Sequence, residues 1–202
     1  NVSFYNETLG QSILPTPIIG MVGMIENVAD AMTANFRGEG RTIAVLEEDQ
    51  AGGGELDVDR RKRLGFFSSE YFKVQGGMSG GEPPEIDLEL EKRVQQCCLA
   101  LLRRRLMESA HDISEGGFLL AILESTFGSP TQNLGFYLEL ETALPLEIFL
   151  FEESPSRIIF SLEEKYLAPG REIAGEYGLS LTRVGTTQPD WVEIGVNHRA
   201  IL

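Results

Sequence analysis

Three short segments hold the residues whose types and spacing could bind a ligand or a metal. The first is the N-terminal run Asn1-Val-Ser-Phe-Tyr-Asn-Glu-Thr8. Its amide, hydroxyl and carboxylate oxygens suit a hard cation, and its hydroxyls can bind a phosphate or a sugar. The same residues are also typical of an ordinary polar turn, so this segment alone leaves both interpretations open.

The second segment predicts a short strand followed directly by a helix. It reads Ala110-His-Asp-Ile-Ser-Glu-Gly-Gly-Phe118. The strand is expected to end at His111 or Asp112, and Asp112 or Ser114 can cap the helix. The paired glycines, Gly116 and Gly117, let other groups approach the first helical turn, whose free N–H groups favour an anion. A tight junction in which the glycines serve packing alone is the alternative.

The third segment, Phe151-Glu-Glu-Ser-Pro-Ser-Arg157, precedes an apolar run. Its carboxylates and arginine could bind a substrate, although a charged loop is the alternative. His111 and Asp112 are adjacent, but neighbours on a strand point to opposite faces. The sequence therefore predicts no Ser-His-Asp or Cys-His set.

The contents of histidine and cysteine exclude several kinds of metal site. The chain has two histidines and two cysteines, and Cys97 and Cys98 are adjacent within a helical pattern. These numbers favour neither a histidine-rich zinc site nor a disulfide framework. Both cysteines are therefore expected to pack in the core.

Hydrophobic periodicity predicts alternating strands and helices. Strands are expected at 17–25, 41–46, 135–140, 157–162, 180–185 and 191–194. Helices are expected at 68–75, 87–107, 114–127 and 163–177, with Asp87 as an N-cap and Gly178 as a stop. The Gly-rich stretch 47–63 is expected to be an exposed loop. Such elements suit a mixed β-sheet flanked by helices, an α/β (α+β) sandwich.

The charge balance argues against large anionic partners. Against 31 acidic residues there are 17 lysines and arginines, a net charge of −14. Such a surface repels nucleic acid and anionic lipid, so we expect neither partner. The basic runs 60–63 and 103–105 are expected to be solvated faces. The longest near-apolar run, 13–25, is too short to span a bilayer, and we expect a cytoplasmic protein.

The segments, taken in order, resemble one enzyme family. The opening run, followed by Pro15-Thr-Pro-Ile-Ile-Gly-Met-Val-Gly23, resembles the junction before the last domain of phosphoribosylformylglycinamidine synthase large subunits. Further short motifs similar to those of the family follow at Ser69–Lys73, Pro84–Glu89, Ala110–Gly117 and Glu153–Arg157. The resemblance implies an AIR synthase C-terminal-domain-like fold over 13–202. It also implies that 1–12 is the tail of a preceding ATP-binding-fold domain.

The resemblance also implies an activity and its cofactors. The family uses ATP and Mg²⁺ to convert formylglycinamide ribonucleotide and glutamine-derived ammonia to the amidine in purine biosynthesis. By position, Asn1 is the expected magnesium ligand and Ser3 the expected substrate contact. No catalytic residue is expected in this chain, because the family carries those residues upstream. A glutaminase subunit and a small accessory subunit are the expected partners, and the fragment alone is expected to be inactive.

Two alternatives remain open at this point. One is a non-catalytic scaffold domain of the same enzyme. The other is a part of a related aminoimidazole ribonucleotide synthetase or selenophosphate synthetase. The sequence does not decide the roles of Asp112, Ser114, Gly116 and Gly117, nor of Glu153–Arg157, where Ser154-Pro-Ser156 departs from the family's Glu-Ser-Gln type of substrate motif.

Overall fold

The structure is a computed structural model that describes residues 7–12, 19–49, 58–77, 80–127 and 134–202. The chain divides into two compact units, Asn1–Ala31 and Met32–Leu202. In the first unit, β1 (Glu7–Thr8) and β2 (Gln11–Ser12) form an antiparallel hairpin. A 3-10 turn, η1 (Val28–Asp30), follows, and the Asn27 side chain accepts a hydrogen bond from its Ala29 N–H.

The second unit is built on a seven-stranded mixed sheet, in the order β4-β6-β3-β7-β5-β8-β9. All the described pairings are antiparallel except β5 with β8, which is parallel. The strands are β3 (Thr42–Glu48), β4 (Ser109–Asp112), β5 (Leu134–Leu140), β6 (Ile158–Leu162), β7 (Leu179–Pro189), β8 (Val192–Val196) and β9 (Arg199–Ala200). The predicted mixed sheet is therefore confirmed.

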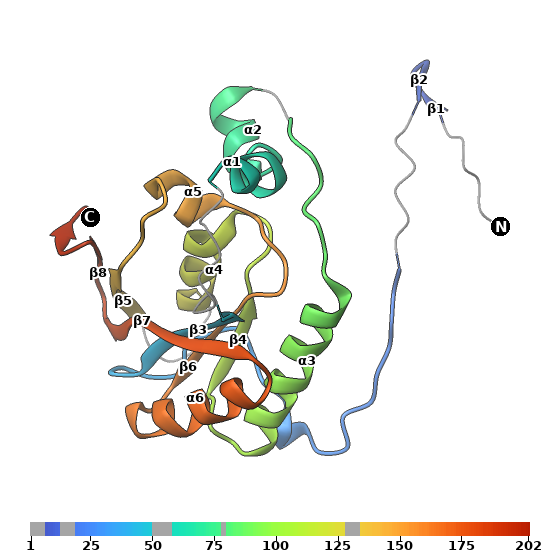
Figure 1. The fold of residues 1–202 in the computed structure, drawn as a ribbon. Helices are drawn as coiled ribbons and strands as arrows, with labels where there is room; N and C mark the ends of the chain where they lie inside the picture. The colour runs from blue at the N-terminus through green and yellow to red at the C-terminus, as the bar shows by residue number, and fades with distance from the viewer. Residues whose placement is uncertain (1–6, 13–18, 50–57, 78–79, 128–133) are drawn as a thin grey trace. The chain divides into compact units, whose positions relative to one another are not determined.

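Helices cover both faces of this sheet (Figure 1). The helices and helical turns are α1 (Val58–Arg61), η3 (Lys62–Phe66, a π-helix), α2 (Glu70–Gly76), α3 (Leu88–Arg103), α4 (Gly117–Thr126), α5 (Leu146–Phe151), η4 (Glu164–Tyr166) and α6 (Leu167–Glu176). One core cluster includes residues of α3 and α6, and the other includes residues of α4 and α5. The predicted α/β sandwich is therefore also confirmed.

The central strand β3 contributes side chains to two hydrophobic cores. Residues 42–46 are all buried. Ala44 and Leu46 pack in the cluster with α3 and α6, whereas Ile43 and Val45 pack in the cluster with α4. Successive side chains of a strand point to opposite faces, so a continuous apolar run is expected where both faces are covered.

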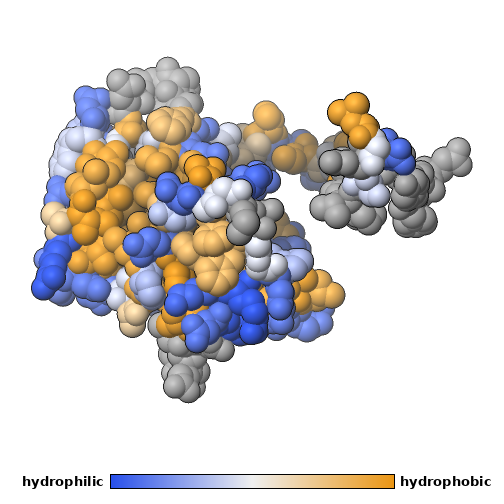
Figure 2. All heavy atoms as spheres, turned by 90° about the horizontal axis from the view of Figure 1, so that it is seen from above, coloured by the Kyte–Doolittle hydropathy of each residue, from blue (hydrophilic) through white to orange (hydrophobic). Residues whose placement is uncertain are grey.

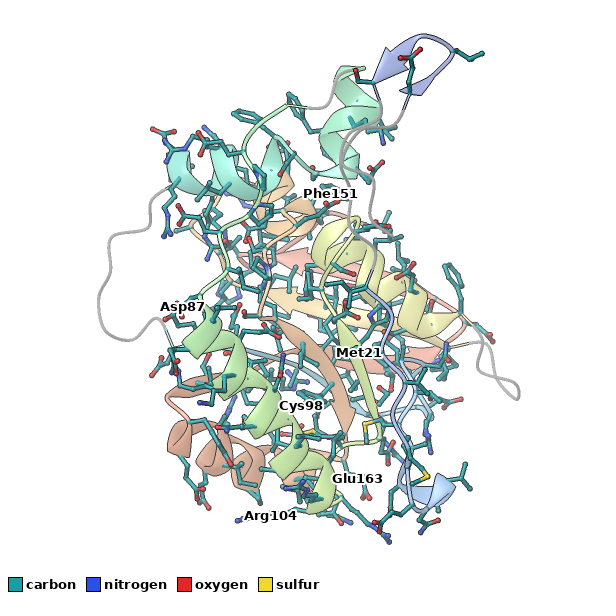
Figure 3. The ribbon with its side chains drawn as sticks, turned by 90° about the vertical axis from the view of Figure 1, so that its right-hand side faces the viewer. Met21, Asp87, Cys98, Arg104, Phe151 and Glu163 are labelled. Carbon is teal, nitrogen blue, oxygen red and sulfur yellow. The ribbon has the colours of Figure 1, made fainter. Side chains whose placement is uncertain are left out.

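Local capping explains where two predicted helices begin and end. The Asp87 side chain accepts from the N–H groups of Glu89 (2.9 Å) and Leu90 (3.1 Å), and Figure 3 shows Asp87 at the start of α3. The Ser69 hydroxyl caps α2, and Gly77 ends it in the left-handed region.

Cys97 is buried and Cys98 is partly buried in the α3–α6 core, and both are free thiols. The core role expected for them is confirmed.

The prediction of a strand at 17–25 is wrong for the part that the structure describes. Residues 19–25 form no strand, and the side chains of Ile19, Met21 and Val22 are 84%, 92% and 103% exposed. An apolar, glycine-spaced run forms a strand only where a neighbouring strand supplies hydrogen-bond partners. Residues 17 and 18 lie outside the described residues.

Two other boundaries differ from expectation. The stretch 47–63 is not one loop, because β3 continues to Glu48 and α1 begins at Val58; residues 50–57 lie outside the described residues. The helix expected from Ser114 begins at Gly117 instead. The short helix α5 and the strand β9 are additions that the sequence pattern did not indicate. On the face seen in Figure 2, hydrophobic and hydrophilic residues lie side by side.

Candidate functional site

A pocket of about 530 Å³ brings together the second and third segments singled out in the sequence. One wall is the β4–α4 junction, and another is the loop between α5 and β6. Segment 83–87 and the first turns of α3 complete it. The lining residues are Pro84, Ile86, Glu91, Val94, Asp112, Ile113, Ser114, Glu115, Glu153, Ser154, Pro155, Ser156, Arg157 and Ile158.

The β4–α4 junction is built by backbone and not by a side-chain cap. Gly116 is the N-cap of α4, with φ 80°, and it makes no side-chain capping bond. The N–H of Gly117 donates to the carbonyl of Ser114 at 3.0 Å. The expectation that Asp112 or Ser114 caps this helix is therefore wrong, because the chain makes a further turn before α4 begins.

The paired glycines allow two close approaches. Gly117 has φ 72°, and a Cβ there would lie 2.8 Å from the backbone of Phe151. A Cβ on Gly116 would lie 2.2 Å from the Leu120 side chain. Only glycine fits both the left-handed backbone and the space. The packing alternative thus accounts for Gly117, since it lets the end of α5 close on the start of α4.

The Glu153 side chain occupies the start of α4. Its Oε1 accepts from the N–H of Gly116 at 2.7 Å and from the N–H of Glu70 at 2.9 Å. The backbone N–H of Glu153 donates to the carbonyl of Gly65 at 3.1 Å. One residue of the third segment therefore joins α2, η3 and α4.

Glu152, the preceding residue, is a buried charge in an ionic cluster. Its side chain is 0% exposed, and its Oε1 accepts from Arg61 and lies 3.5 Å from the Arg157 guanidinium. Arg157 also donates to Glu47 at 3.2 Å. Burial raises the pKa of Glu152, an effect that the charges of Arg61 and Arg157 oppose and that of Glu47 reinforces. The charged loop expected here is in fact anchored in the core.

Sequence reasoning missed the partners that α1, η3 and α2 supply to this site. The basic run 60–63 was expected to be a solvated face, but Arg61 is partly buried against Glu152. A Cβ on Gly65 would lie 3.1 Å from the Ser154 hydroxyl oxygen and 3.7 Å from the backbone nitrogen of Glu153. The phenol ring of Tyr71 stacks on Phe151, with ring centroids 4.0 Å apart. A glycine directly before two phenylalanines, in Leu64-Gly-Phe-Phe67, was the available signal for such a close approach.

The His111 side chain contacts three polar groups. Its Nδ1 lies 2.8 Å from the backbone carbonyl of Asp112 and 3.5 Å from the Asp112 carboxylate, and its Nε2 lies 3.2 Å from the Glu124 carboxylate on α4. Asp112 lines the pocket, whereas His111 is not among the lining residues. Of these two neighbouring side chains, only Asp112 therefore borders this cavity.

Metal and membrane features are not found in the part of the chain that the structure describes. No group of three or more His, Cys, Asp and Glu side chains there could hold a metal ion. None of the helices among the described ranges is both long and apolar enough to cross a bilayer. Asn1 and Ser3, the expected magnesium ligand and substrate contact, lie outside the described residues.

The chain is an α/β domain in which helices flank a mixed sheet. Its pocket lies between the β4–α4 junction and the α5–β6 loop. The family model "AIR synthase related protein, C-terminal domain" matches residues 38–197. This chain belongs to that family. The match covers every element from β3 to β8 and confirms the fold that the resemblance implied.

Curated relatives agree with this assignment along the whole chain. It is 39% identical over 202 residues to the phosphoribosylformylglycinamidine synthase subunit PurL of Caldanaerobacter subterraneus, covering 100% of this chain and 25% of the relative. It is 37% identical to the same subunit of Anaeromyxobacter dehalogenans, covering 96% of this chain and 25% of the relative. The chain thus spans about a quarter of the length of these relatives.

Solved structures show the same fold at lower identity. Thermotoga maritima PurL complexed with FGAR matches with a TM-score of 0.66 and 18% identity, over 87% of this chain and 28% of that one. Structures of the same Thermotoga protein include complexes with ADP and with ATP, and a PurLQS assembly.

Proposed function

We propose that this chain is the C-terminal part of an ATP-dependent ligase that makes formylglycinamidine ribonucleotide from formylglycinamide ribonucleotide and glutamine-derived ammonia. The single observation that supports this most is whole-chain identity of 39% to a phosphoribosylformylglycinamidine synthase subunit. The complexes of Thermotoga maritima PurL with FGAR and with ATP agree with that substrate and cofactor. In the reaction, ATP turns the formamide oxygen into a phosphoryl leaving group, which ammonia displaces.

Within such an enzyme, this chain supports the active site more than it performs the reaction. The described residues offer no group of carboxylates or histidines suited to a metal ion. Asn1 as a ligand of Mg²⁺ and Ser3 as a substrate contact remain proposals. The division into a tail at 1–12 and a domain at 13–202 is a proposal too. Its tail is part of the compact unit Asn1–Ala31.

The partners follow from the same proposal. Thermotoga maritima PurL occurs in a PurLQS assembly. We expect the complete protein to work with a glutaminase subunit and a small accessory subunit in the cytoplasm. Neither nucleic acid nor a membrane is an expected partner, given the net charge of −14.

A purely supporting role is the second candidate, and one observation favours it. The start of α4, which could have held an anion, is bonded to the chain's own Glu153. In that case Asn1 and Ser3 contact no ligand, and only the fold of the domain matters to the enzyme. An origin in a related aminoimidazole ribonucleotide or selenophosphate synthetase is a further alternative.

The decisive experiment uses the full-length protein that contains this chain, with ammonium chloride as the nitrogen source. We expect ATP consumption that depends on formylglycinamide ribonucleotide, and none with formylglycinamidine ribonucleotide or selenide. Ser3→Ala should raise the KM for the ribonucleotide, and Asn1→Ala should raise the Mg²⁺ concentration needed for half-maximal rate. Ser12→Ala, in the neighbouring hairpin, is the matched control.

The outcomes separate the candidates. Absence of activity that depends on formylglycinamide ribonucleotide in an intact, assembled enzyme removes the ligase proposal. If activity is present but Asn1→Ala and Ser3→Ala both match the Ser12→Ala control, the supporting role is correct and the two site assignments are wrong. Activity with selenide or with the amidine ribonucleotide would instead support a related synthetase.

A further inference from the structure

The apolar segment 19–25 is exposed along its whole length. It contains no charged residue, and Figure 1 draws it, in blue, without a helix or strand. Its large side chains are between 64% and 103% exposed: Ile19, Met21, Val22, Met24 and Ile25. We propose that this segment is a docking surface, which is buried in the complete protein by the part of the polypeptide that precedes Asn1.

Exposure of such a run is unusual for a folded protein. Removal of apolar surface from water is the main favourable contribution to folding and to association. Single exposed apolar residues are common, but a contiguous exposed apolar stretch marks an interaction site. In the compact unit Met32–Leu202, by contrast, helices cover both faces of the sheet and the two core clusters are buried. The segment 19–25 therefore requires a partner beyond the described residues.

The pattern of the segment predicts that this partner covers it from two sides. In an extended backbone, successive side chains point to opposite faces. Apolar side chains then lie on both faces, with Ile19 and Met21 on one and Val22 on the other. Gly20 and Gly23 leave room for another backbone to come close. The interior of a fold covers both faces of an extended segment, whereas a single flat surface covers one.

A second copy of this chain is disfavoured as the partner. Each chain carries a net charge of −14, so two copies repel each other. Two copies that met through 19–25, face to face, would also cover one face of each segment and leave the other in water.

The preceding part of the complete protein is large enough to cover both faces. The segment lies within the 202 residues that are 39% identical to the PurL subunit of Caldanaerobacter subterraneus, and the match covers 25% of that relative. About three quarters of that relative's length therefore lies outside the match. Under the proposed function this remainder precedes Asn1 and is joined to the segment through residues 1–18. A covalent link of this kind gives the two parts a high effective concentration, which favours docking.

The inference rests on the proposed function in one respect, namely that a longer polypeptide precedes this chain. It does not depend on the ligase activity. A full-length protein that is active with formylglycinamide ribonucleotide while 19–25 stays exposed would refute the inference alone. Burial of 19–25 in a full-length protein that lacks this activity would refute the ligase proposal alone.

The test measures amide hydrogen exchange of 19–25 by mass spectrometry in the full-length protein and in the 202-residue chain. In the full-length protein, we expect these amides to exchange at least about 100-fold more slowly than in an unstructured peptide. In the 202-residue chain, no backbone hydrogen bond joins 19–25 to another described residue, so exchange should lie within about tenfold of the peptide rate. Exchange at the peptide rate in the full-length protein would overturn the proposal.

A charged substitution tests whether the side chains of the segment are what docks. Val22→Asp places a carboxylate in the proposed interface, where loss of its hydration is costly. In the full-length protein, it should speed the exchange of the 19–25 amides at least about tenfold relative to the wild type. The matched control is Val74→Asp, at a valine of α2 that is 76% exposed, and it should leave this exchange unchanged. Equal exchange in the two variants would mean that 19–25 is not docked through its side chains.

Sedimentation of the 202-residue chain at several concentrations identifies the other occupant. The expected result is a monomer whose 19–25 amides are unprotected. If the chain instead dimerises, protects 19–25, and becomes a monomer with Val22→Asp, the segment docks on a second copy and the proposal is wrong.

Discussion

Arg157 lies 3.5 Å from the carboxylate of Glu152, and the two side chains are 10% and 0% exposed. Arg61, at the end of α1, donates to the same carboxylate oxygen. The second oxygen of Glu152 has no hydrogen-bond partner among the described residues. The attachment of α1 to the sheet therefore depends on one buried carboxyl oxygen that two arginines share.

Removal of this carboxylate should destabilise the domain strongly. In Glu152→Ala, Arg157 keeps its contact with Glu47, but Arg61 and Arg157 both lose the buried acceptor oxygen that they share. Leaving a buried donor without its acceptor typically costs about 1–3 kcal/mol, and more when the donor is charged. We expect a loss of this size in the free energy of unfolding, measured by urea titration of the 202-residue chain.

The matched control is an exposed ion pair of the same residue types. Glu85 pairs with Arg60 at 2.5 Å, and their side chains are 65% and 57% exposed. Glu85→Ala should change the free energy of unfolding by less than about 1 kcal/mol. If both alanine variants lose similar amounts, burial of Glu152 is not what makes its ion pair important.

Stability should depend on pH through Glu152. Burial raises its pKa in the folded chain, so the folded state binds this proton more tightly than the unfolded chain does. The favourable contribution is fully present below the unfolded Glu pKa of about 4.3 and is lost as the pH rises through the raised folded value. The Glu152→Gln variant has no titratable group at this position, so it lacks this contribution to the pH dependence of stability.

The measurement compares urea unfolding of the wild type and Glu152→Gln between about pH 4 and pH 7. The stability of the wild type relative to the variant should decrease as the pH rises through this range. A difference that stays constant with pH would mean that the pKa of Glu152 is the same in the folded and unfolded chains.

Much of the sheet and its largest helix could be predicted from local patterns. Strands β5 to β8 follow from apolar runs bounded by turns, and α3 follows from its apolar stripe and the Asp87 cap. The short helix α5 was missed because six mostly apolar residues between strands carry too little periodicity to distinguish a helix from a strand.

The site itself depends on contacts that no local pattern contains. Glu153 and Glu70 are 83 positions apart, and Arg61 and Glu152 are 91 apart. The sequence identified Gly116 and Gly117, and also the 153–157 loop, but gave no reason to place them together. Their meeting follows from the position of β6 between β4 and β3 in the sheet, which is set by the packing of the whole domain.

Alanine at Gly117 should be far more harmful than alanine at Gly175. Gly117 is in the left-handed region, and its Cβ would lie 2.8 Å from Phe151 backbone atoms, which cannot rotate away. The backbone strain alone costs about 1–2 kcal/mol, and the clash adds to it. We expect Gly117→Ala to lower the free energy of unfolding by more than about 2 kcal/mol in a urea titration.

Alanine at Gly175, in α6, should have the opposite effect on the free energy of unfolding. Nothing lies within 4 Å of a Cβ placed there, and its backbone is helical. Gly175→Ala should therefore stabilise the chain by about 0.5–1 kcal/mol, because alanine loses less backbone entropy on folding. Equal effects at the two positions would show that the α4 junction tolerates a side chain.

Cys97 should resist thiol reagents in the folded chain. It is fully buried, and burial, with smaller contributions from Cys98 and Glu176, raises its pKa to about 11. At pH 8 only roughly a thousandth of such a thiol is thiolate, which is the reactive form. Titration with a disulfide reagent should leave Cys97 unmodified until denaturant is added; rapid modification of folded Cys97 would mean that α3 opens readily.

Deletion of residues 1–31 should leave a domain that folds on its own. The chain Met32–Leu202 keeps the hydrogen bonds from Ala110 N–H to Thr33 and from Phe36 N–H to Ser125. It also keeps Phe36, which is 1% exposed in the α4–α5 core. We expect cooperative thermal unfolding with a Tm within a few degrees of that of the full chain.

A shorter chain that starts at Gly38, where the family match begins, loses the Phe36 ring. It should be about 3–5 kcal/mol less stable than the chain that starts at Met32. Equal stability of the two shortened chains would show that residues 32–37 are not part of the folded unit, because loss of a buried aromatic ring cannot be neutral in a closely packed core.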